Sequence, residues 1–577
     1  MMKLQSLLAC VTVFVFTTLI PSPAASQDAA EQARLAQIAR DAAHRFAEDR
    51  AAVQQARPVV PATSNGSAVE MTLSEATARA LERNLDIAVE RLNPQTQDLA
   101  LARVQATYRP TLTSAFSQQS RINPPNSTLN GGLIVDNDTS TFNAGIAQNL
   151  KWFGSSVNFQ FNNNRQVSSN SFNNYNPAYN SNFSLIYTQP VLRGLTIDSN
   201  RQQLRVTAIA RDVSEIQLKG MITSTVSSVR NAYWELAYAL RAIEVARGSL
   251  DLAQKLLEDN RARVEVGTLA PLDVAQSDAE VANRRGLVAQ AEGAARTAEI
   301  TLKRLIVNGT EDPLWRAHIT PVDRPDFQSA PVDVEVAVRA ALNNRTDLAT
   351  ARKTVESNDW TLQLLRNQRL PELDLSAQYG AVGLGGRQAI RTGSGITSVI
   401  TGYVPGGYTD TWRTLTGGDF PNWNVQLNLS YPIGQSTAEA NYARARVQRN
   451  QTVSQLRALE LTVAADVENA AVLVESSLTR YDAAKAAREL QQQRLDAEQS
   501  RFDVGLSTNF FVVQAQRDLA SAQITELRAL LDYQHALVDF ERSQSAPATR
   551  GGAGITTIGA AGGGGVNAVG GGQGGTP

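Results

Sequence analysis

The chain has 577 residues and a formal net charge of −1, and aromatic residues make up only 6% of it. A chain of this length could hold several ordinary domains, although length is only a soft guide to domain count. Since neither sign of charge dominates and no block of like charge occurs, the sequence offers no basic field that would attract nucleic acid.

The first residues are predicted to form a secretory signal peptide. Lys3 supplies a positive charge, and an apolar run of about fourteen residues follows from Leu7 to Ile20. Small residues at 24–26 suit cleavage. The run falls short of the ~20 residues that a membrane-spanning helix needs. We therefore expect a signal peptide at residues 1–26 and a chain that leaves the cytoplasm.

Two terminal segments are expected to lie outside the main fold. Residues 27–69 read as a polar N-terminal helix followed by a proline-containing linker. Residues 544–577 are rich in glycine and alanine and hold too few large apolar side chains to form a core, so we expect a disordered tail there.

Between these ends the sequence contains two copies of one unit. An internal repeat relates residues 70–307 to residues 332–543, with a proline-rich connector at 308–331. Two pairs of matching segments carry the alignment: 81–87 with 342–348, and 263–267 with 501–505. The second pair is offset by 238 residues. Each copy should therefore have the same fold.

Each copy is predicted to open with a helix and to continue as strands. The opening helices are expected from Leu73 to about Tyr108 and from Val334 to about Leu370. A proline then ends each helix, because its ring removes a donor and clashes with the preceding turn. Strands are expected at about 111–190 and 372–432, with an extra hairpin in the first copy. Two Asn-, Ser- or Gly-rich stretches read as exposed loops: 162–182 and 380–418.

One strand of the second copy has an apolar and a polar face. Apolar residues alternate with Asn, Gln and Ser from Trp423 to Tyr431, and these two aromatics lie about 26 Å apart at strand rise. Aromatic girdles flank the apolar band of an outer-membrane β-barrel at about this spacing. A soluble sandwich would explain the alternation of this strand equally well.

Each copy is then predicted to end in a long antiparallel helical hairpin. The first helices run from about Ser199 to Val264 and from about Ser436 to Phe502, which is about 100 Å at helical rise. Apolar residues in both recur at alternating steps of three and four, as in a coiled coil. The returning helices are expected at about 272–306 and 510–543, so the hairpins span about 199–306 and 436–543.

No catalytic or metal-binding constellation is predicted. The only cysteine, Cys10, lies in the apolar run of the signal peptide, which excludes disulfides and thiol chemistry from the mature chain. His44, His318 and His535 lie in different segments, without partners at metal-ligand spacing. We expect no enzyme activity, no cofactor and no metal, and any energy for transport would come from a partner.

The ordered set of features resembles the TolC-like outer membrane efflux protein family. The two Val-Gly turns at 266–267 and 504–505 and the Ala232–Leu236 segment of the first long helix carry the likeness, which covers about 70–543. The resemblance implies a mainly α chain with a membrane β-barrel portion, built from a duplicated strand and long-hairpin unit. It also implies a homotrimer, whose barrel lies in outer-membrane lipid and whose helices form a periplasmic tunnel.

In such a duct, the hairpin turns meet a periplasmic adaptor protein. The resemblance makes six residues at the turns candidates for adaptor contacts: Arg263, Val266, Gly267, Arg501, Val504 and Gly505. Inward-facing aspartates narrow the entrance in the family. Asp273, six residues after Gly267, is the matching gate candidate, and Phe511 occupies the corresponding site of the second copy. Alternatively, Asp273 only stabilises the positive N-terminus of its helix.

The favoured function is that of a passive outer-membrane exit duct in a tripartite efflux system. It would carry small molecules and dock to the adaptor and an inner-membrane pump. A duct for type I protein secretion is an alternative with the same architecture. An alternative of another class is a coiled-coil envelope scaffold without a pore, against which the amphipathic strands argue because a scaffold needs no lipid-facing band.

Overall fold

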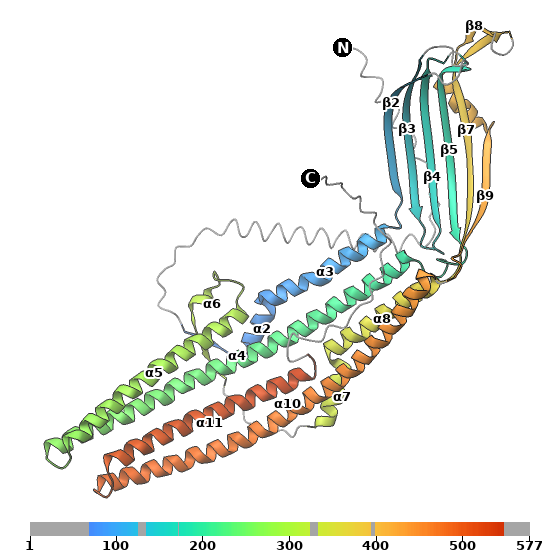
Figure 1. Cartoon of the computed structure of the whole chain (residues 1–577). Coiled ribbons are helices and arrows are strands. Elements are labelled where there is room, and N and C mark those ends of the chain that lie inside the picture. Colours follow the sequence, from blue (N-terminus) through green and yellow to red (C-terminus); the bar gives the residue numbers. More distant parts are fainter. Residues whose placement is uncertain are drawn as a thin grey trace, which may run out of the picture. The chain divides into compact units, whose positions relative to one another are not determined.

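The computed structural model describes residues 68–124, 134–170, 172–323, 333–393, 398–434 and 436–546 (Figure 1). The expected signal peptide, the polar N-terminal helix and the Gly/Ala-rich part of the tail lie outside these ranges. None of the helices within them is long and apolar enough to cross a membrane.

The described chain alternates groups of strands with groups of helices. The helices are α2 (Leu73–Arg83), α3 (Leu85–Ala106), α4 (Ser199–Glu265), α5 (Pro271–Ile306), α6 (Pro313–Arg316), α7 (Val334–Asn344), α8 (Thr346–Asn367), α9 (Tyr408–Gly417), α10 (Thr437–Asp503) and α11 (Asn509–Ser543). The strands are β1 (Ala68–Met71), β2 (Thr111–Asn123), β3 (Val135–Asn149), β4 (Ser156–Ser168), β5 (Tyr175–Pro190), β6 (His318–Pro321), β7 (Glu372–Thr392), β8 (Val399–Val404) and β9 (Pro421–Ser430).

Seven strands form one antiparallel sheet that combines both copies of the repeat. The order is β2-β3-β4-β5-β7, and both β8 and β9 pair with β7. β9 pairs with the first half of β7, from Glu372, and β8 pairs with its last residues, up to Thr392. Within the described residues β2 pairs only with β3 and β9 only with β7, so the sheet has two open edges.

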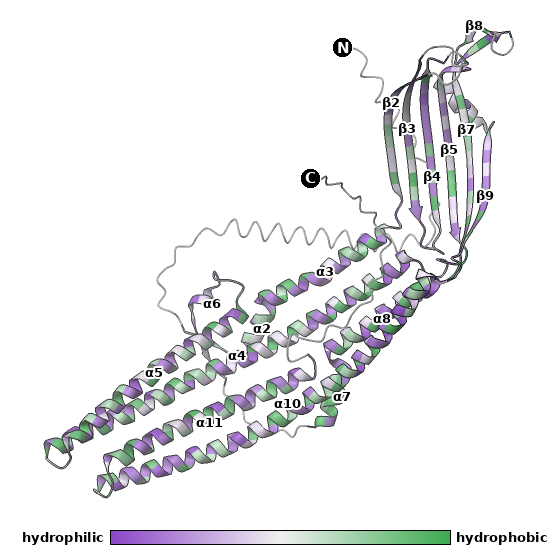
Figure 2. Ribbon diagram, viewed as in Figure 1, coloured by the Kyte–Doolittle hydropathy of each residue, from purple (hydrophilic) through white to green (hydrophobic). Residues whose placement is uncertain are grey.

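The two faces of this sheet differ in chemistry, and the alternation along its strands can be followed in Figure 2. Cross-strand pairing places one set of apolar side chains on a single face: Leu112, Phe116, Phe142, Ile146, Phe159, Leu185, Tyr187, Tyr379, Trp423, Val425, Leu427 and Leu429. The opposite face carries mainly uncharged amides and hydroxyls, including Thr113, Asn143, Asn158, Gln160, Asn162, Asn182, Gln378, Asn422, Asn424 and Gln426. Such alternation is what a sheet between lipid and water requires.

The two expected exposed loops are wrong. Most of the stretch 162–182 lies in β4 and β5, and the stretch 380–418 contains the second half of β7, β8 and α9. Asparagine has a low strand propensity, but here the amides pair across the ladder. Asn162 Nδ2 donates to Asn182 Oδ1 (3.1 Å), and Asn180 Nδ2 donates to Asn164 Oδ1 (3.0 Å).

The two opening helices are each broken once, where a single helix was expected. Asn84 separates α2 from α3, and Arg345 separates α7 from α8, both in an extended conformation. The Asn84 side chain accepts a hydrogen bond from the Ile87 amide (3.1 Å), so it caps the second helix. Arg345 is buried and pairs with Asp347 (2.9 Å). The matching breaks show that the repeat extends to backbone detail.

The long helices bury or half-bury the predicted heptad positions. α4 packs against α5, and α10 packs against α11, while α11 also lies along α4 (Figure 1). Val229 and Leu236 of α4 are buried in one cluster with apolar residues of α5. Val463 and Val467 of α10 are buried mainly against α7 and α8. This apolar seam, rather than helix propensity, stabilises helices of 67 residues.

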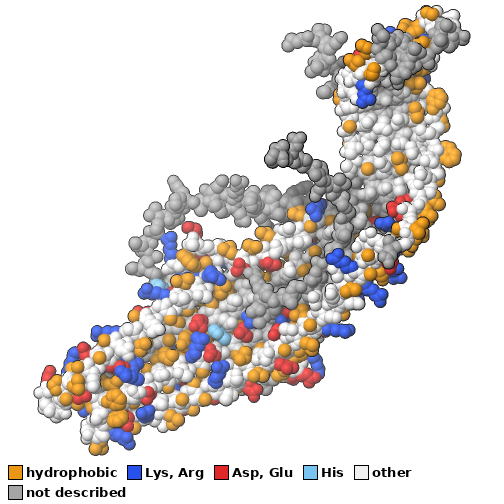
Figure 3. Space-filling model, viewed as in Figure 1, with side chains coloured by type: hydrophobic (Ala, Val, Ile, Leu, Met, Phe, Trp, Pro, Cys, Tyr) orange, Lys and Arg blue, Asp and Glu red, His pale blue; other side chains and the backbone are white. Residues whose placement is uncertain are grey.

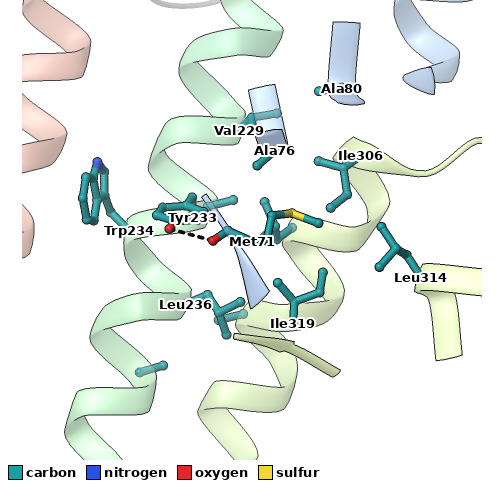
Figure 4. Close-up of a cluster of buried hydrophobic side chains, with 14 of the residues drawn as sticks. Met71, Ala76, Ala80, Val229, Tyr233, Trp234, Leu236, Ile306, Leu314 and Ile319 are labelled. Atoms are coloured by element: carbon teal, nitrogen blue, oxygen red, sulfur yellow. Dashed lines mark hydrogen bonds between the residues drawn. The ribbon is translucent and has the colours of Figure 1, made fainter. Parts of the chain in front are cut away.

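The largest buried cluster joins α4 to a small parallel pair of strands, β1 and β6 (Figure 4). The Tyr233 hydroxyl donates to the Met71 carbonyl oxygen (3.0 Å) and lies 3.0 Å from the Asp323 carboxylate. Burial raises the pKa of Tyr233 to about 12. Tyr233 and Trp234 belong to the Ala232–Leu236 segment noted in the sequence, and the structure shows that this segment forms the centre of a core.

Charged side chains are distributed unevenly over the molecule. Figure 3 shows Lys, Arg, Asp and Glu gathered over the helices and few of them over the sheet, on the face that it presents. The helices are therefore suited to water, whereas the sheet exposes apolar and uncharged side chains.

Candidate functional site at the hairpin turns

The two hairpin turns have nearly the same backbone. Gly267 and Gly505 both have φ of +78°, a left-handed conformation that favours glycine. In each, the residue after the glycine donates its amide to a carbonyl five residues back: Thr268 to Arg263 (2.9 Å) and Leu506 to Arg501 (2.8 Å). This pattern closes a helix C-terminus, and it explains why glycine recurs at both turns.

The two gate candidates occupy equivalent places. Asp273 is the third residue of α5, and Phe511 is the third residue of α11. Asp273 is half-buried, and its carboxylate has no hydrogen bond or ion pair with any described residue. Phe511 is exposed, and its ring packs edge-on against that of Phe510 at 5.6 Å. The structure thus places an unpaired acid at one turn and an aromatic pair at the other.

The two arginine candidates are held differently. Arg263 reaches from the first hairpin to the second, where it pairs with Asp503 (3.0 Å), stacks on the Phe502 ring (4.4 Å) and donates to the Phe502 carbonyl (3.3 Å). Arg501 is more exposed, and among the described residues it pairs only with Glu498 of its own helix (3.1 Å). Arg263 therefore links the hairpins, and Arg501 is the freer of the two for a partner.

A buried amide cluster behind the turns was not predicted from the sequence. Asn260 Nδ2 donates to Asn509 Oδ1 (2.8 Å) and to Ser277 Oγ (2.8 Å), which joins α4, α11 and α5. Asn260 is 0% exposed and Asn509 1%. The Asn260 Oδ1 atom has no partner among the described residues. Asn260 and Asn509 lie 249 residues apart, and the sequence analysis gave no signal for their contact.

A second buried link was also missed. Glu280 of α5, with a side chain only 3% exposed, pairs with Arg284 of its own helix (2.6 Å) and with Arg517 of α11. Burial opposes the ionised form of Glu280, but the hydrogen bonds and charges of Arg517 and Arg284 outweigh it and hold its pKa below the usual range. Glu280 is therefore ionised at neutral pH and ties the two hairpins together.

The turns also expose apolar side chains to solvent. Six of them are more than half exposed: Val266, Leu272, Val504, Leu506, Phe510 and Phe511. Exposed apolar side chains that cluster at one place mark a surface for a partner. The candidate girdle residues at the sheet, Trp423 and Tyr431, are likewise exposed, and Trp423 lies on the apolar face of β9.

The described residues show no evident metal-binding site. No group of three or more His, Cys, Asp or Glu there could hold a metal ion. His318 contacts Glu299 (3.4 Å), and His535 lies 3.2 Å from the Asn231 carbonyl oxygen, so each sits in an ordinary polar contact.

Comparisons with known proteins agree with the geometry. The family model described as outer membrane efflux protein matches residues 138–308 and 337–543. The chain is 27% identical over 305 residues to the pyoverdine export outer membrane protein OpmQ of Pseudomonas aeruginosa. That match covers 52% of this chain and 56% of the relative, so the chain spans little more than half the length of the curated relative.

Two solved structures have the same fold. The CmeC outer membrane channel of Campylobacter jejuni superposes with a TM-score of 0.58 at 15% identity, covering 82% of this chain and 85% of that one. The outer membrane protein VceC of Vibrio cholerae gives a TM-score of 0.58 at 14% identity, covering 82% and 96%. Since the family model matches more than half of the chain, once in each copy of the repeat, the chain belongs to the outer membrane efflux protein family and is an outer-membrane protein whose helices extend into the periplasm.

Proposed function

We propose that the chain is one protomer of a trimeric exit duct that exports small molecules passively across the outer membrane. The observation that carries this proposal is the two-faced sheet with two open edges. An open edge presents unpaired backbone groups, which cannot face lipid. Pairing β9 of one protomer with β2 of the next protomer removes both open edges.

The number of strands supports a trimer. Each protomer contributes six strands to the apolar face, namely β2, β3, β4, β5, β7 and β9. Six strands are too few to close around a lumen, whereas barrels of about 16–18 strands leave an aqueous channel. Three copies fall at the top of that range. The amide-rich face would then line water, and the apolar face would meet lipid.

The hairpin turns would form the periplasmic entrance and the docking surface. Their exposed apolar side chains suit contact with an adaptor, and through it with an inner-membrane pump that supplies the energy. We infer that the chain itself catalyses nothing. The similarity to a protein named for pyoverdine export supports an export role.

At the entrance, Asp273 would form a ring of three carboxylates in a trimer, which favours cations. Phe511 would add an apolar collar. The links made by Asn260, Glu280 and Arg263 would hold the two hairpins of each protomer together, and so set the width of the closed entrance.

The test is the mass and shape of the detergent-purified protein. Electron microscopy should show particles with threefold symmetry, a micelle-bound barrel and a helical tube with a lumen, at the mass of three chains. Monomers, or solid rods without a lumen, would overturn the duct and favour an envelope scaffold.

A further inference from the structure

α9 is a short helix that the proposed export function leaves unexplained. It lies between β8 and β9 in the sequence, and it packs on β7 and β5. Thr411 and Leu415, four residues apart on one side of α9, are buried against the sheet. The Thr411 hydroxyl donates to the Tyr179 carbonyl (3.2 Å), and the Thr414 hydroxyl donates to the Leu384 carbonyl (3.2 Å).

The seat of α9 is built into β7. A Cβ atom at Gly383 would collide with the Thr411 carbonyl oxygen, and one at Gly385 would collide with the Thr411 hydroxyl. Only glycine lets a helix approach a strand this closely. The contact is therefore a defined docking of helix on sheet.

The register shows which face α9 covers. Gly383 pairs with Ser181, two residues from Phe183, which itself pairs with Phe161. Trp412 of α9 stacks on the Phe161 ring, with centroids 5.4 Å apart. Phe161 lies on the apolar face. α9 is thus on the apolar side of the sheet, not on the side of the amides.

The position of α9 along the strands coincides with the end of the apolar band. On β7 the outward side chains from Leu373 to Ala381 cover about 26 Å at strand rise, close to the ~25 Å of an outer-membrane apolar band. Gly383 and Gly385 follow directly. On β4, which β5 separates from β7, Phe161 is the last apolar residue of this face before Asn163 and Arg165.

The exposed side of α9 is amphipathic. Tyr408 and Trp412 are partly exposed beside the apolar band, with ring centroids 6.2 Å apart. Arg413 is 81% exposed, and its one ion pair with a described residue is a long contact with Asp410 (3.6 Å). Amphipathic aromatic rings and long basic side chains gather where acyl chains give way to headgroups.

We propose that α9 is an interfacial helix that anchors the duct in the headgroup region of the outer leaflet. Tyr408 and Trp412 lie at the boundary of the acyl chains, and Arg413 and Arg165 meet phosphate groups. The partner is a lipid surface with phosphate-bearing headgroups. This inference rests on the proposed duct, because it takes the apolar face as the one that meets lipid.

The test measures depth by spin labelling. Cys10 is the only cysteine of the chain, so a Cys10→Ser background allows one label at a time. Labels at Thr409→Cys on α9, Val425→Cys in the apolar band and Val399→Cys on β8 are compared in vesicles of phosphatidylethanolamine and phosphatidylglycerol. The measured quantity is the ratio of collisions with oxygen to collisions with a water-soluble nickel complex.

The expected order of that ratio is Val425 highest, Thr409 intermediate and severalfold above Val399, and Val399 lowest. If Thr409 matches Val399 while Val425 stays high, α9 is in water and the interfacial helix is wrong, although the duct stands. If Val425 is also in water, the apolar face does not meet lipid and the proposed duct fails with it.

A matched pair of glycine variants tests the seat itself. Gly385→Ala should unseat α9 and lower the ratio at Thr409 severalfold, without changing it at Val425. Gly402→Ala on β8 is the control, since the nearest atom to its new Cβ lies 3.7 Å away. An unchanged ratio at Thr409 in Gly385→Ala would contradict the close packing of α9 on β7.

Discussion

The two helical hairpins share a backbone but differ in the side chains that connect them. Both turns place glycine at φ of +78° and close with the same hydrogen bonds. In the first hairpin, Asn260 and Glu280 reach across to the second. Their counterparts 238 residues later, Glu498 and Asp518, stay within their own hairpin, bonded to Ser507 (2.8 Å) and Arg494 (3.0 Å).

This difference separates two roles of the repeat. The duplicated backbone supplies two hairpins of nearly equal length. Leu256 of the first hairpin packs against Phe502 and Val512 of the second. The side chains that differ make the contacts between the hairpins unequal. The buried polar groups that reach across, Asn260 and Glu280, belong to the first hairpin, and their counterparts in the second do not reach back. Variants at equivalent positions should therefore have unequal effects wherever a cross-hairpin link exists, and equal effects wherever only the backbone matters.

The largest inequality is expected at Glu280 and Asp518. Glu280→Gln leaves Arg284 without its charged partner in a site where both side chains are less than a tenth exposed. We expect a loss of about 3 kcal/mol in the free energy of unfolding, the lower end for a broken buried pair because Arg517 is half-exposed. Asp518→Asn should cost about 1 kcal/mol or less, since its pair with Arg494 is more exposed.

Guanidinium unfolding of the detergent-solubilised protein, followed by the helical circular dichroism signal, measures both losses. Equal losses at the two positions would show that Glu280 contributes no more than a surface pair. Equal losses would also mean that the ion pair of Glu280 with Arg517 does not stabilise the contact between the hairpins.

A smaller effect is expected where the two returning helices begin. α5 begins with Pro271 and α11 with Asn509, which are equivalent positions. Asn509→Pro should keep the helix, because proline suits the first turn, and Thr508 before it is already extended. It removes one of the two hydrogen-bond partners of buried Asn260, at a cost of about 1–3 kcal/mol.

The same variant should raise the closed-state conductance of the duct in planar bilayers, because one link between the hairpins is lost. Pro271→Ala is the matched control, since it changes the same position of the other hairpin without touching the cluster, and it should leave conductance unchanged. If both variants conduct alike, the amide cluster does not hold the entrance closed.

Equal effects are expected at the two turn glycines. A Cβ at Gly267 or Gly505 meets no atom within 4 Å, so an alanine there suffers only from the left-handed backbone. We expect about 1–2 kcal/mol for each. Gly248→Ala, within α4 and also free of neighbours, should instead stabilise by about 0.5–1 kcal/mol. Thermal unfolding of the three variants checks the sign and the equality.

The comparison also shows what the sequence could and could not predict. The long helices were predicted to within about a residue at each end, because a heptad pattern and a Val-Gly turn are local signals. The links made by Asn260 and Glu280 join residues more than 230 positions apart, and no local pattern carries them.

The sheet was predicted less well, for a different reason. Asn- and Gly-rich stretches are typical of loops, yet here they form β4, β5 and β7. In a sheet with one face toward water, amides satisfy each other across the strands, as Asn162 and Asn182 do. In β7, Gly383 and Gly385 make room for α9. Composition alone therefore misreads strands whose glycines and amides serve a tertiary contact.

The smallest effect on stability, and the most direct test of the gate, is expected at Asp273. Its carboxylate has no partner among the described residues, so Asp273→Asn should change the free energy of unfolding by at most about 0.3–1 kcal/mol, the range of a charge at a helix N-terminus. If three such carboxylates ring the entrance, the same variant should lower the preference of the closed duct for cations over anions, since a charged ring sets ion selectivity.

The two possible roles of Asp273 then separate cleanly, because each moves a different measurement. A gate residue changes the reversal potential across a salt gradient, and Asp273→Ala also raises the closed-state conductance. If Asp273 only stabilises its helix, its substitution lowers the free energy of unfolding and leaves both electrical readings unchanged. Phe511→Ala is the matched variant in the other hairpin: it carries no charge, so it should widen the entrance without altering selectivity. A shift in selectivity at Phe511 but not at Asp273 would contradict the acidic ring.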